Sequence, residues 1–365
     1  MKYVDEFRDP ARAEALLRRI RAHATRPVRL MEFCGTHTHA IFRHGLRQLL
    51  PPQVTMLSGP GCPVCVTSAA DLDRAIALSR IPGVTIATFG DMMRVPGSQG
   101  SLQEAKAAGA DVRVVYSSLD ALDLARKQPD RTVVLLGVGF ETTAPTVAAA
   151  IVQAAAEGLG NLRLLSLHKL TPPATHAILR SGEVALDGIL APGHVSAIIG
   201  AQAWQFVARD YALPCTVTGF EPLDILAGIA DLVEQHEAGR AELHNAYPRG
   251  VRPQGNPAAL ELMGRVFAPA PASWRGLGTL PGSGLALREE YRAFDAAPLL
   301  AAHGVGTAEA REPAGCRCGD VLRGALAPNR CPLFRRVCTP ERPVGPCMVS
   351  SEGSCAAYYR YGGDA

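Results

Sequence analysis

The 365-residue sequence has no strong excess of charge of either sign and no hydrophobic run long enough to cross a membrane. Lysine and arginine number 37 against 34 aspartate and glutamate, which leaves a formal net charge of +3. A charge so close to balance excludes the extended basic field with which proteins attract nucleic acid or anionic lipid. No window approaches the roughly 20 apolar residues that a membrane-spanning helix needs. We therefore expect neither a nucleic-acid partner nor a membrane anchor.

The first 27 residues also lack the apolar core of a secretory signal peptide, because charged side chains are frequent among them. This pattern predicts a cytoplasmic protein. Ten cysteines are then not explained by a framework of disulfides, since the cytosol keeps thiols reduced. Their number indicates metal binding or redox chemistry instead.

Short apolar runs recur along the first 240 residues, and each is followed by a segment with helical spacing. This alternation is typical of α/β domains in which helices cover a parallel sheet. The starts of the first four runs and of the next four are offset by 103 to 109 residues, which favours two similar domains facing a cleft. The expected strands are at 28–33, 53–58, 84–89, 111–116, 132–138, 162–167, 187–192 and 214–219.

We predict a first α/β domain over residues 1–130, with a helix at 8–24 packed on its outside, and a second α/β domain over 131–240. After residue 245 proline and glycine become frequent, so short helices at most are expected there. The stretch 312–360 has six cysteines and few large apolar residues, which predicts a small region built around an inorganic core. Residues 241–365 are accordingly assigned to a Pro/Gly-rich segment and a metal-binding region.

In an open parallel sheet, ligands bind beside the loops that follow the carboxyl ends of the strands. Three cysteines lie in such loops of the predicted first domain: Cys34 in "CGTHTH", and Cys62 and Cys65 in "GPGCPVC". Polar residues at strand ends are often functional, so Cys34 is a candidate site residue. His37 and His39 are two positions apart, and a helix would turn only one of them toward the crevice.

Other polar residues at the strand tips are equally well explained by structural roles. Five of them would serve as helix caps or ion-pair partners if they take no part in chemistry: Asp91, Arg94, Glu141, His168 and His194. Cys215 lies inside an apolar run and is expected to pack in the core, as free cysteine commonly does.

The two residues between Cys62 and Cys65 allow both thiols to face one point, which suits a metal ion or a reversible disulfide. Structural zinc sites usually combine two such motifs, and the two predicted α/β domains contain no second one. The glycines before Cys62 allow the backbone to approach a partner closely, and a helix beginning at Pro63 would lower a thiol pKa through its dipole. The pattern favours thiol chemistry, with Cys34 as a third sulfur.

The C-terminal cysteines are unevenly spaced, and no histidine lies among them. Four thiolates hold either zinc or an iron–sulfur cluster, and spacing alone does not separate the two. All-thiolate ligation and the presence of another dithiol in the chain favour a 4Fe–4S cluster. The six residues are Cys316, Cys318, Cys331, Cys338, Cys347 and Cys355.

Five motifs, in order along the chain, resemble the HypD family of nickel–iron hydrogenase maturation proteins. They are "FCGTHTH", "GPGCPVCVT", "FGDMMRVPGS", "GFETTAPT" and the tail from "CRCGDVLRG" to "GSCAAYY". The resemblance implies two α/β domains and a third, cluster-bearing region. The family's cluster ligands are separated by fourteen, six and sixteen residues, a spacing similar to that of ferredoxin–thioredoxin reductase. They correspond here to Cys316, Cys331, Cys338 and Cys355, and the family's three other functional cysteines to Cys34, Cys62 and Cys65.

This resemblance implies a scaffold on which iron receives two cyanides and one carbonyl before delivery to the hydrogenase large subunit. A HypC-type small chaperone would share the iron, and a HypE-type protein would supply the cyanide. Cys34 would bind the iron, with His37 as a further residue of the site. Cys62 and Cys65 would contact the iron or exchange electrons with the cluster as dithiol and disulfide. Cys318 and Cys347 fall outside the ligand set.

Two functions of other classes stay open at this point. One is a cluster-dependent thiol–disulfide oxidoreductase that acts on a protein partner. The other is a structural zinc protein that docks partners, for which the tail would hold zinc without sulfide.

Overall fold

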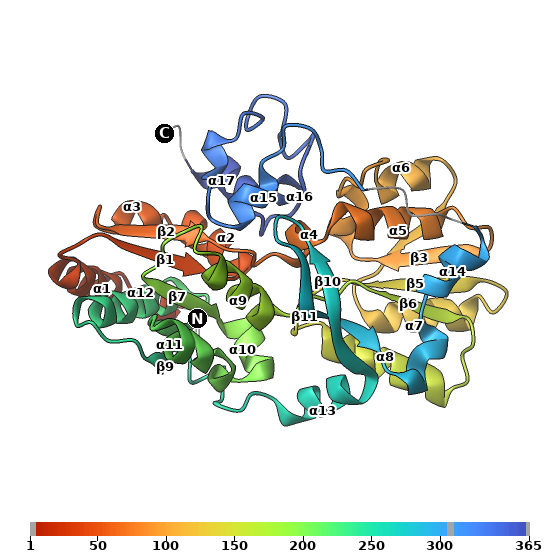
Figure 1. The fold of residues 1–365 in the computed structure, drawn as a ribbon, viewed down its shortest axis with the longest axis horizontal. Coiled ribbons are helices and arrows are strands. Elements are labelled where there is room, and N and C mark those ends of the chain that lie inside the picture. The colour runs from red at the N-terminus through yellow and green to blue at the C-terminus, as the bar shows by residue number, and fades with distance from the viewer. Residues whose placement is uncertain (1–4, 305–309, 363–365) are drawn as a thin grey trace.

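Two parallel β-sheets, each covered by helices, form two lobes that lie side by side in the computed structural model (Figure 1). The structure describes residues 5–304 and 310–362. The first sheet has the strand order β2-β1-β7-β8-β9, and the second has the order β4-β3-β5-β6. The predicted α/β class is confirmed, and the eight predicted strands begin within one residue of their expected starts.

The first sheet consists of β1 (Val28–Glu32), β2 (Val54–Ser58), β7 (Gly188–Pro192), β8 (Cys215–Thr218) and β9 (Leu243–Asn245). The second consists of β3 (Val84–Thr88), β4 (Asp111–Val114), β5 (Thr132–Gly137) and β6 (Leu162–Ser166). β3 is buried at every position, and β5 at every position after its first. Helices on both faces of the second sheet explain why these strands are buried along their length and contain no charged residue.

Each sheet takes strands from both sides of the predicted boundary at residue 130. β1 pairs with β2 and also with β7, where Leu30 lies opposite Gly188. In the second sheet β3 pairs with β5, and Val84 lies opposite Thr132. The chain therefore leaves the first lobe after β2, builds the second lobe and returns at β7, so the lobes do not correspond to 1–130 and 131–240. Strand pairing is a long-range contact that a repeated spacing along the sequence does not determine.

The helix expected at 8–24 is α1 (Pro10–His23), and it packs on the outside of the first lobe against α12 (Pro222–Glu237). Asp9 caps it by accepting hydrogen bonds from the backbone of Ala11 and Arg12, and Pro10 occupies the first helical position. The other helices of this lobe are α2 (Gly35–Arg43), α3 (Leu46–Leu49), α4 (Pro63–Val66), α10 (Gly193–Ile199) and α11 (Gln205–Tyr211), with 3-10 turns η1 (Asp5–Phe7) and η3 (Ala201–Trp204).

The second lobe is covered by four helices and one 3-10 turn: α5 (Ala69–Ser79), α6 (Leu102–Ala107), α7 (Ser118–Lys127), α8 (Ala144–Ala156) and η2 (Gly90–Arg94). The helix that follows β6, α9 (Thr171–Ser181), packs on the first lobe instead, where His176 stacks on Phe206. Ser101 and Ser117 open α6 and α7 with capping boxes, each closed by an acidic side chain three residues later. In the described ranges no helix is both long enough and apolar enough to cross a bilayer.

The segment after residue 245 contains a long β-hairpin that the sequence analysis missed. α13 (Pro257–Val266) leads into β10 (Phe267–Trp274), which pairs antiparallel with β11 (Gly278–Leu287). The register shifts between Ala270 and Ala272, so Pro271 sits in an irregularity where a missing backbone donor is tolerated. Figure 1 shows the hairpin standing between the two lobes, with its turn directed toward the C-terminal region.

The C-terminal region lies over the junction of the lobes, in contact with α2 and α4 (Figure 1). It contains short helices with long connecting turns, as the shortage of large apolar residues predicts. Its elements are α15 (Cys318–Leu322), η5 (Pro328–Arg330), α16 (Pro346–Val349) and α17 (Ser354–Tyr361), and before them η4 (Glu289–Phe294) and α14 (Ala297–Ala302) lie against the second lobe.

Candidate thiol and metal site

The loops that carry Cys34 and the dithiol touch each other at the carboxyl edge of the first sheet. β1 and β2 are neighbours with Glu32 opposite Ser58, so the chain leaves both strands at the same level. The backbone nitrogen of Gly35 donates to the carbonyl of Gly61 at 2.8 Å. A Cβ atom on Gly61 would overlap the backbone of Cys34, so only glycine permits this approach.

Cys62 is the N-cap residue of the single-turn helix α4, Cys65 lies within that turn, and the two are joined by a disulfide. Both side chains are buried. The sulfur of Cys62 also accepts a hydrogen bond from the backbone nitrogen of Cys65 at 3.3 Å, which is the cap of this turn. Of the two states that the spacing allows, a metal-binding dithiol and a disulfide, the structure shows the disulfide.

Cys34 is the N-cap residue of α2 and is 8% exposed. Burial raises the pKa of its thiol to about 12, and the nearby carboxylate of Glu352 acts in the same direction. The backbone N–H groups of His37 and Thr36, in the first turn of α2, point at the sulfur and oppose this rise. The lowered thiol pKa predicted from the helix start at Pro63 concerned Cys62 and Cys65, which are joined in a disulfide, whereas the raised pKa of Cys34 keeps this residue a thiol at neutral pH. Binding of a metal by Cys34 must therefore release a proton.

Two carboxylates lie beside Cys34, the buried Glu32 and the half-buried Glu352, and the sequence analysis named neither of them. Glu32 accepts a hydrogen bond from the backbone nitrogen of Cys34 at 2.8 Å and another from Thr38. Burial raises the pKa of Glu32 to about 8. Glu352 comes from the C-terminal region, accepts a hydrogen bond from Thr36 at 2.7 Å and packs against Gly35. Glu32 could have been identified from the sequence, because it is an acidic residue inside an apolar strand. The position of Glu352 could not, because it depends on tertiary contacts alone.

Only one of the two histidines in this loop faces inward, as expected. The Nε2 atom of His37 lies 2.9 Å from the carbonyl of Gly219 and 3.0 Å from the Thr218 hydroxyl, at the tip of β8. Its ring stacks on Phe220, and burial lowers its pKa to about 4, so it is neutral. Its Nδ1 atom is buried and has no partner within the described ranges. His39 instead lies against the C-terminal region.

The C-terminal cysteines converge on one cavity. Its lining also includes Leu333, Phe334, Met348 and the backbone of Gly345. The sulfurs of Cys318 and Cys347 are in direct contact. The thiols come from four separate segments of the region, and they are Cys316, Cys318, Cys331, Cys338, Cys347 and Cys355.

The donor set is compatible with the predicted 4Fe–4S cluster. Over the part of the chain that the structure describes, no three His, Cys, Asp or Glu side chains are placed to share one metal ion. The four cysteines expected to hold a cluster nevertheless all border the same cavity, and thiolates are the ligands that hold iron–sulfur clusters in proteins. Two further thiols border it as well, so the geometry alone does not choose four among the six.

The disulfide and the cysteine cavity are adjacent. The Cys65 sulfur lies 4.0 Å from the carbonyl oxygen of Pro346, the residue before Cys347, and α4 packs against α16. The two disulfide cysteines and four cysteines of the cavity (Cys318, Cys338, Cys347 and Cys355) belong to one continuous buried apolar cluster. The C-terminal region therefore covers both the disulfide and, through Glu352, the Cys34 loop.

The remaining candidates at the strand tips have structural roles. Arg94 donates to the carbonyls of Pro340 and Val349 and so ties η2 to the C-terminal region. Glu141 is buried and accepts two hydrogen bonds from Thr171, while Asp91 lies in the first turn of η2. The ring of His194 stacks on Phe220 at 3.7 Å. Cys215 is fully buried within β8, which confirms its expected core position.

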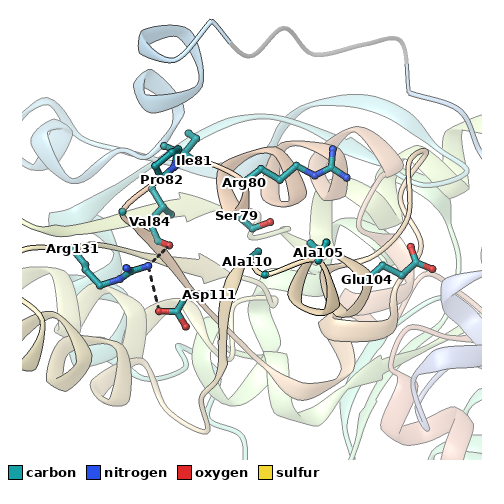
Figure 2. Close-up of a pocket in the computed structure, with 13 residues that line it drawn as sticks. Ser79, Arg80, Ile81, Pro82, Val84, Glu104, Ala105, Ala110, Asp111 and Arg131 are labelled. Carbon is teal, nitrogen blue, oxygen red and sulfur yellow. Dashed lines mark hydrogen bonds and ion pairs between the residues drawn. The ribbon is translucent and has the colours of Figure 1, made fainter.

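A separate open cavity of about 990 Å³ lies at the opposite edge of the second sheet (Figure 2). It is bordered by the amino ends of β3, β4 and β5. Arg131 there donates to the carbonyl of Val84 and pairs with Asp111. Its lining contains neither cysteine nor histidine, and it lies at the edge away from the strand tips where ligands of such sheets bind. We therefore place the site at the thiols.

His168 gives the stability of the protein a defined pH dependence. It is buried beside Phe267 of the hairpin, and burial, with Lys169 acting in the same direction, lowers its pKa to about 3. Because the unfolded chain binds the proton near pH 6.5, the contribution of His168 is present above that pH and is lost as pH falls toward 3. Between pH 6.5 and pH 5 the loss should be about 2 kcal/mol of unfolding free energy.

This loss is measured by urea denaturation across that pH range. His168→Gln should flatten the curve, and His303→Gln, at an exposed position, should leave it unchanged. An equally steep curve for His168→Gln would show that His168 is not the group responsible.

Gly61→Ala tests the contact between the two thiol loops. The new Cβ would meet the Cys34 backbone, which has little freedom to move at the start of α2. We expect a loss of about 1–3 kcal/mol in the free energy of unfolding, as for overpacked cores. Gly160→Ala is the matched control, because its Cβ would enter open space. Equal stability of the two variants would mean that the loops do not pack as described.

Comparisons with known proteins agree on one family. The model of the family described as "HypD: Hydrogenase formation hypA family" matches residues 11–362. The chain is 48% identical to the "Hydrogenase maturation factor HypD" of Rhodobacter capsulatus, over 100% of this chain and 99% of that protein. It is 50% identical to the protein of that name from Azotobacter vinelandii, over 99% and 97%. Identity to that of Escherichia coli K12 is 44%, over 99% and 98%.

Proposed function

Because the chain belongs to the HypD family of hydrogenase maturation factors, we propose that it is the scaffold on which the Fe(CN)2CO group of nickel–iron hydrogenases is assembled. The iron with its cyanide and carbonyl ligands is the cargo, which is passed on to the hydrogenase large subunit. The observation that carries the proposal is the contact between the Cys34 loop and the disulfide loop, beneath a region where six cysteines line one cavity.

In this proposal Cys34 is the residue that binds the iron. A soft thiolate suits low-spin iron carrying strong-field diatomic ligands. Since burial holds Cys34 as a thiol, the proton leaves when the metal arrives, and the N–H groups at the start of α2 then stabilise the thiolate. The neutral ring of His37 closes the inner side of this loop. Burial also limits access of water to the cyanide-bearing metal.

Cys316, Cys331, Cys338 and Cys355 would hold a resident 4Fe–4S cluster, which supplies single electrons when bound. Cys62 and Cys65 form the redox-active pair. Reduction of their disulfide takes up two electrons and two protons and yields two thiols, which are then free to contact the iron. The 4.0 Å approach of Cys65 to the backbone before Cys347 supports exchange between the two groups of cysteines.

The proposal includes the partner proteins that such assembly requires. It also assigns the assembly of the iron group to the cytoplasm. A HypC-type chaperone would share the iron with Cys34, and a HypE-type protein would donate cyanide. The edge formed by Cys34, Thr36 and Glu352 is where a shared ligand would have to enter.

One observation also favours a second candidate, a thiol–disulfide oxidoreductase. The disulfide beside a cavity of cysteines is the arrangement that such an enzyme needs. An oxidoreductase differs from the scaffold in one testable respect: the isolated protein would turn over a disulfide substrate. We expect no such turnover above the uncatalysed rate, since both sulfurs of the disulfide are buried.

Analysis of iron, zinc and acid-labile sulfide in anaerobically purified protein tests the proposal. We expect a brown protein with four iron and four sulfide per chain in the cluster, plus further iron when the chaperone is co-purified. Colourless protein that contains zinc without sulfide would exclude the cluster and leave the docking protein as the explanation. Rapid reduction of a disulfide substrate by the isolated chain would favour the oxidoreductase.

A further inference from the structure

The turn of the β10–β11 hairpin places an arginine in the interior of the molecule. Arg275 follows directly after Trp274, the last residue of β10, and its side chain is only 1% exposed. A guanidinium stays charged in proteins, so this burial brings a full positive charge into a medium of low dielectric. Such a charge is costly unless its surroundings compensate it, and its position therefore calls for an explanation.

Arg275 is bound to the segment that follows the disulfide. Its backbone nitrogen donates to the carbonyl of Val66 at 2.8 Å, and its Nε atom donates to the carbonyl of Thr67 at 3.1 Å. Its Nη1 atom pairs with Glu312 at the start of the cysteine-rich region. Its Nη2 atom is buried and has no partner within residues 5–304 and 310–362. The cation is thus only partly compensated by the residues around it.

The same side chain lies within electrostatic reach of three thiols of the cysteine cavity. Burial lowers the pKa of Arg275, and the thiols of Cys318, Cys347 and Cys316 oppose this effect, in that order. The next residue, Gly276, touches the backbone of Gly319, which directly follows Cys318. Arg275 therefore lies between the disulfide turn and the cavity, in contact with the first and within electrostatic reach of the second.

We propose that Arg275 is a positioning residue of the redox centre, which fixes the disulfide turn against the cysteine cavity and favours the more reduced state of a cluster held there. This inference rests on the proposed function, because it presupposes the cluster. Reduction adds one negative charge to the contents of the cavity, and a fixed cation nearby stabilises that charge. Removal of the cation should therefore make the cluster harder to reduce.

Arg323 provides a natural comparison, because it reaches the same turn with a compensated charge. It donates to the carbonyl of Gly276 at 2.8 Å but also pairs with Glu183 and Asp320. Its side chain is 23% exposed, so water and two carboxylates screen it. Loss of Arg323 therefore removes a contact with the hairpin but changes the electrostatic potential in the cysteine cavity only slightly.

The experiment is an anaerobic spectroelectrochemical titration of the visible absorption of the cluster. Arg275→Gln should lower the equilibrium constant for one-electron reduction at least tenfold, a shift of about 59 mV to more negative potential. Arg275→Lys keeps the charge and should recover at least half of that shift. Arg323→Gln should shift the potential by less than a third as much. An unchanged potential in Arg275→Gln, or an equal shift in Arg323→Gln, would overturn the inference.

A second variant keeps the test decisive if Arg275→Gln fails to take up a cluster. Glu312 is 51% exposed, so Glu312→Gln should fold, and it removes the carboxylate that partly neutralises Arg275. The potential should then rise, opposite in sign to the loss of the arginine, and a potential that stays the same or falls contradicts the inference. Wild-type protein without a cluster would refute the proposed function as well, whereas unchanged potentials in a cluster-bearing protein refute only the role of Arg275.

Discussion

Cys34→Ala is expected to abolish the cyanide and carbonyl stretching bands in the infrared spectrum of the complex with the small chaperone. The visible absorption of the cluster should be unchanged. The reason is the separation of tasks in the structure, where Cys34 belongs to the loop after β1 and the cluster cavity is lined by the C-terminal region alone. In the proposed scaffold, loss of the Cys34 sulfur removes the thiolate that binds the iron while the disulfide is intact.

Cys215→Ala is the matched control for this experiment. Cys215 is another buried thiol of the first sheet, but it lies inside β8 and packs in the core. Its loss should reduce stability modestly and leave both the infrared bands and the visible absorption in place. Persistence of the bands in Cys34→Ala would show that the iron is held elsewhere.

Cys338→Ser should bleach the protein, and Cys331→Ser should do the same. Loss of one of four thiolates leaves the cluster one ligand short, and a region with so few large apolar residues depends on its inorganic core for stability. We expect loss of the visible absorption and of the bound sulfide, together with faster proteolysis within residues 312–361. The two α/β lobes have cores of their own and should keep their helical circular dichroism.

Cys318→Ser and Cys347→Ser are the controls, because these two thiols border the same cavity but lie outside the expected ligand set. Both variants should stay brown. If they bleach while Cys338→Ser keeps its colour, the assignment of the four ligands from their spacing is incorrect.

The strands were predictable because their signal is local. Runs such as "VTIAT" and "TVVLLG" are rich in β-branched and apolar residues and contain no charge, because both faces of the sheet are buried, and their bounds follow from the next charged residue or turn. The assignment of strands to sheets was not predictable in this way. Whether β1 pairs with β7 or stays apart from it depends on contacts between residues that are more than 150 positions apart, such as Leu30 and Gly188.

The hairpin was missed because its composition does not look like a pair of strands. Alanine, proline and glycine dominate "FAPAPASW" and "GTLPGSGLAL", and none of the three favours a strand. Proline is tolerated here because a two-stranded hairpin has two free edges. The buried Arg275 was missed for the same reason, since a charged residue in a glycine-rich turn is ordinarily exposed.

The sequence placed Cys34 and the dithiol at neighbouring strand tips, and the structure packs these two loops against each other. It did not indicate the electrostatics of the site. The pKa of Cys34 is raised because the C-terminal region buries it and brings Glu352 beside it, although more than 300 residues separate the two along the chain. Local features such as the helix start at Cys34 would lower the pKa of its thiol, but burial raises the pKa by more than they lower it.

Mössbauer spectroscopy of anaerobically purified, isotopically enriched protein, with and without its small chaperone, tests the central claim most directly. The account predicts a cluster signal in both samples and an additional low-spin mononuclear iron in the complex. Iron confined to the cluster in both samples, or no iron at all, would contradict the claim that this chain holds the iron while its ligands are added.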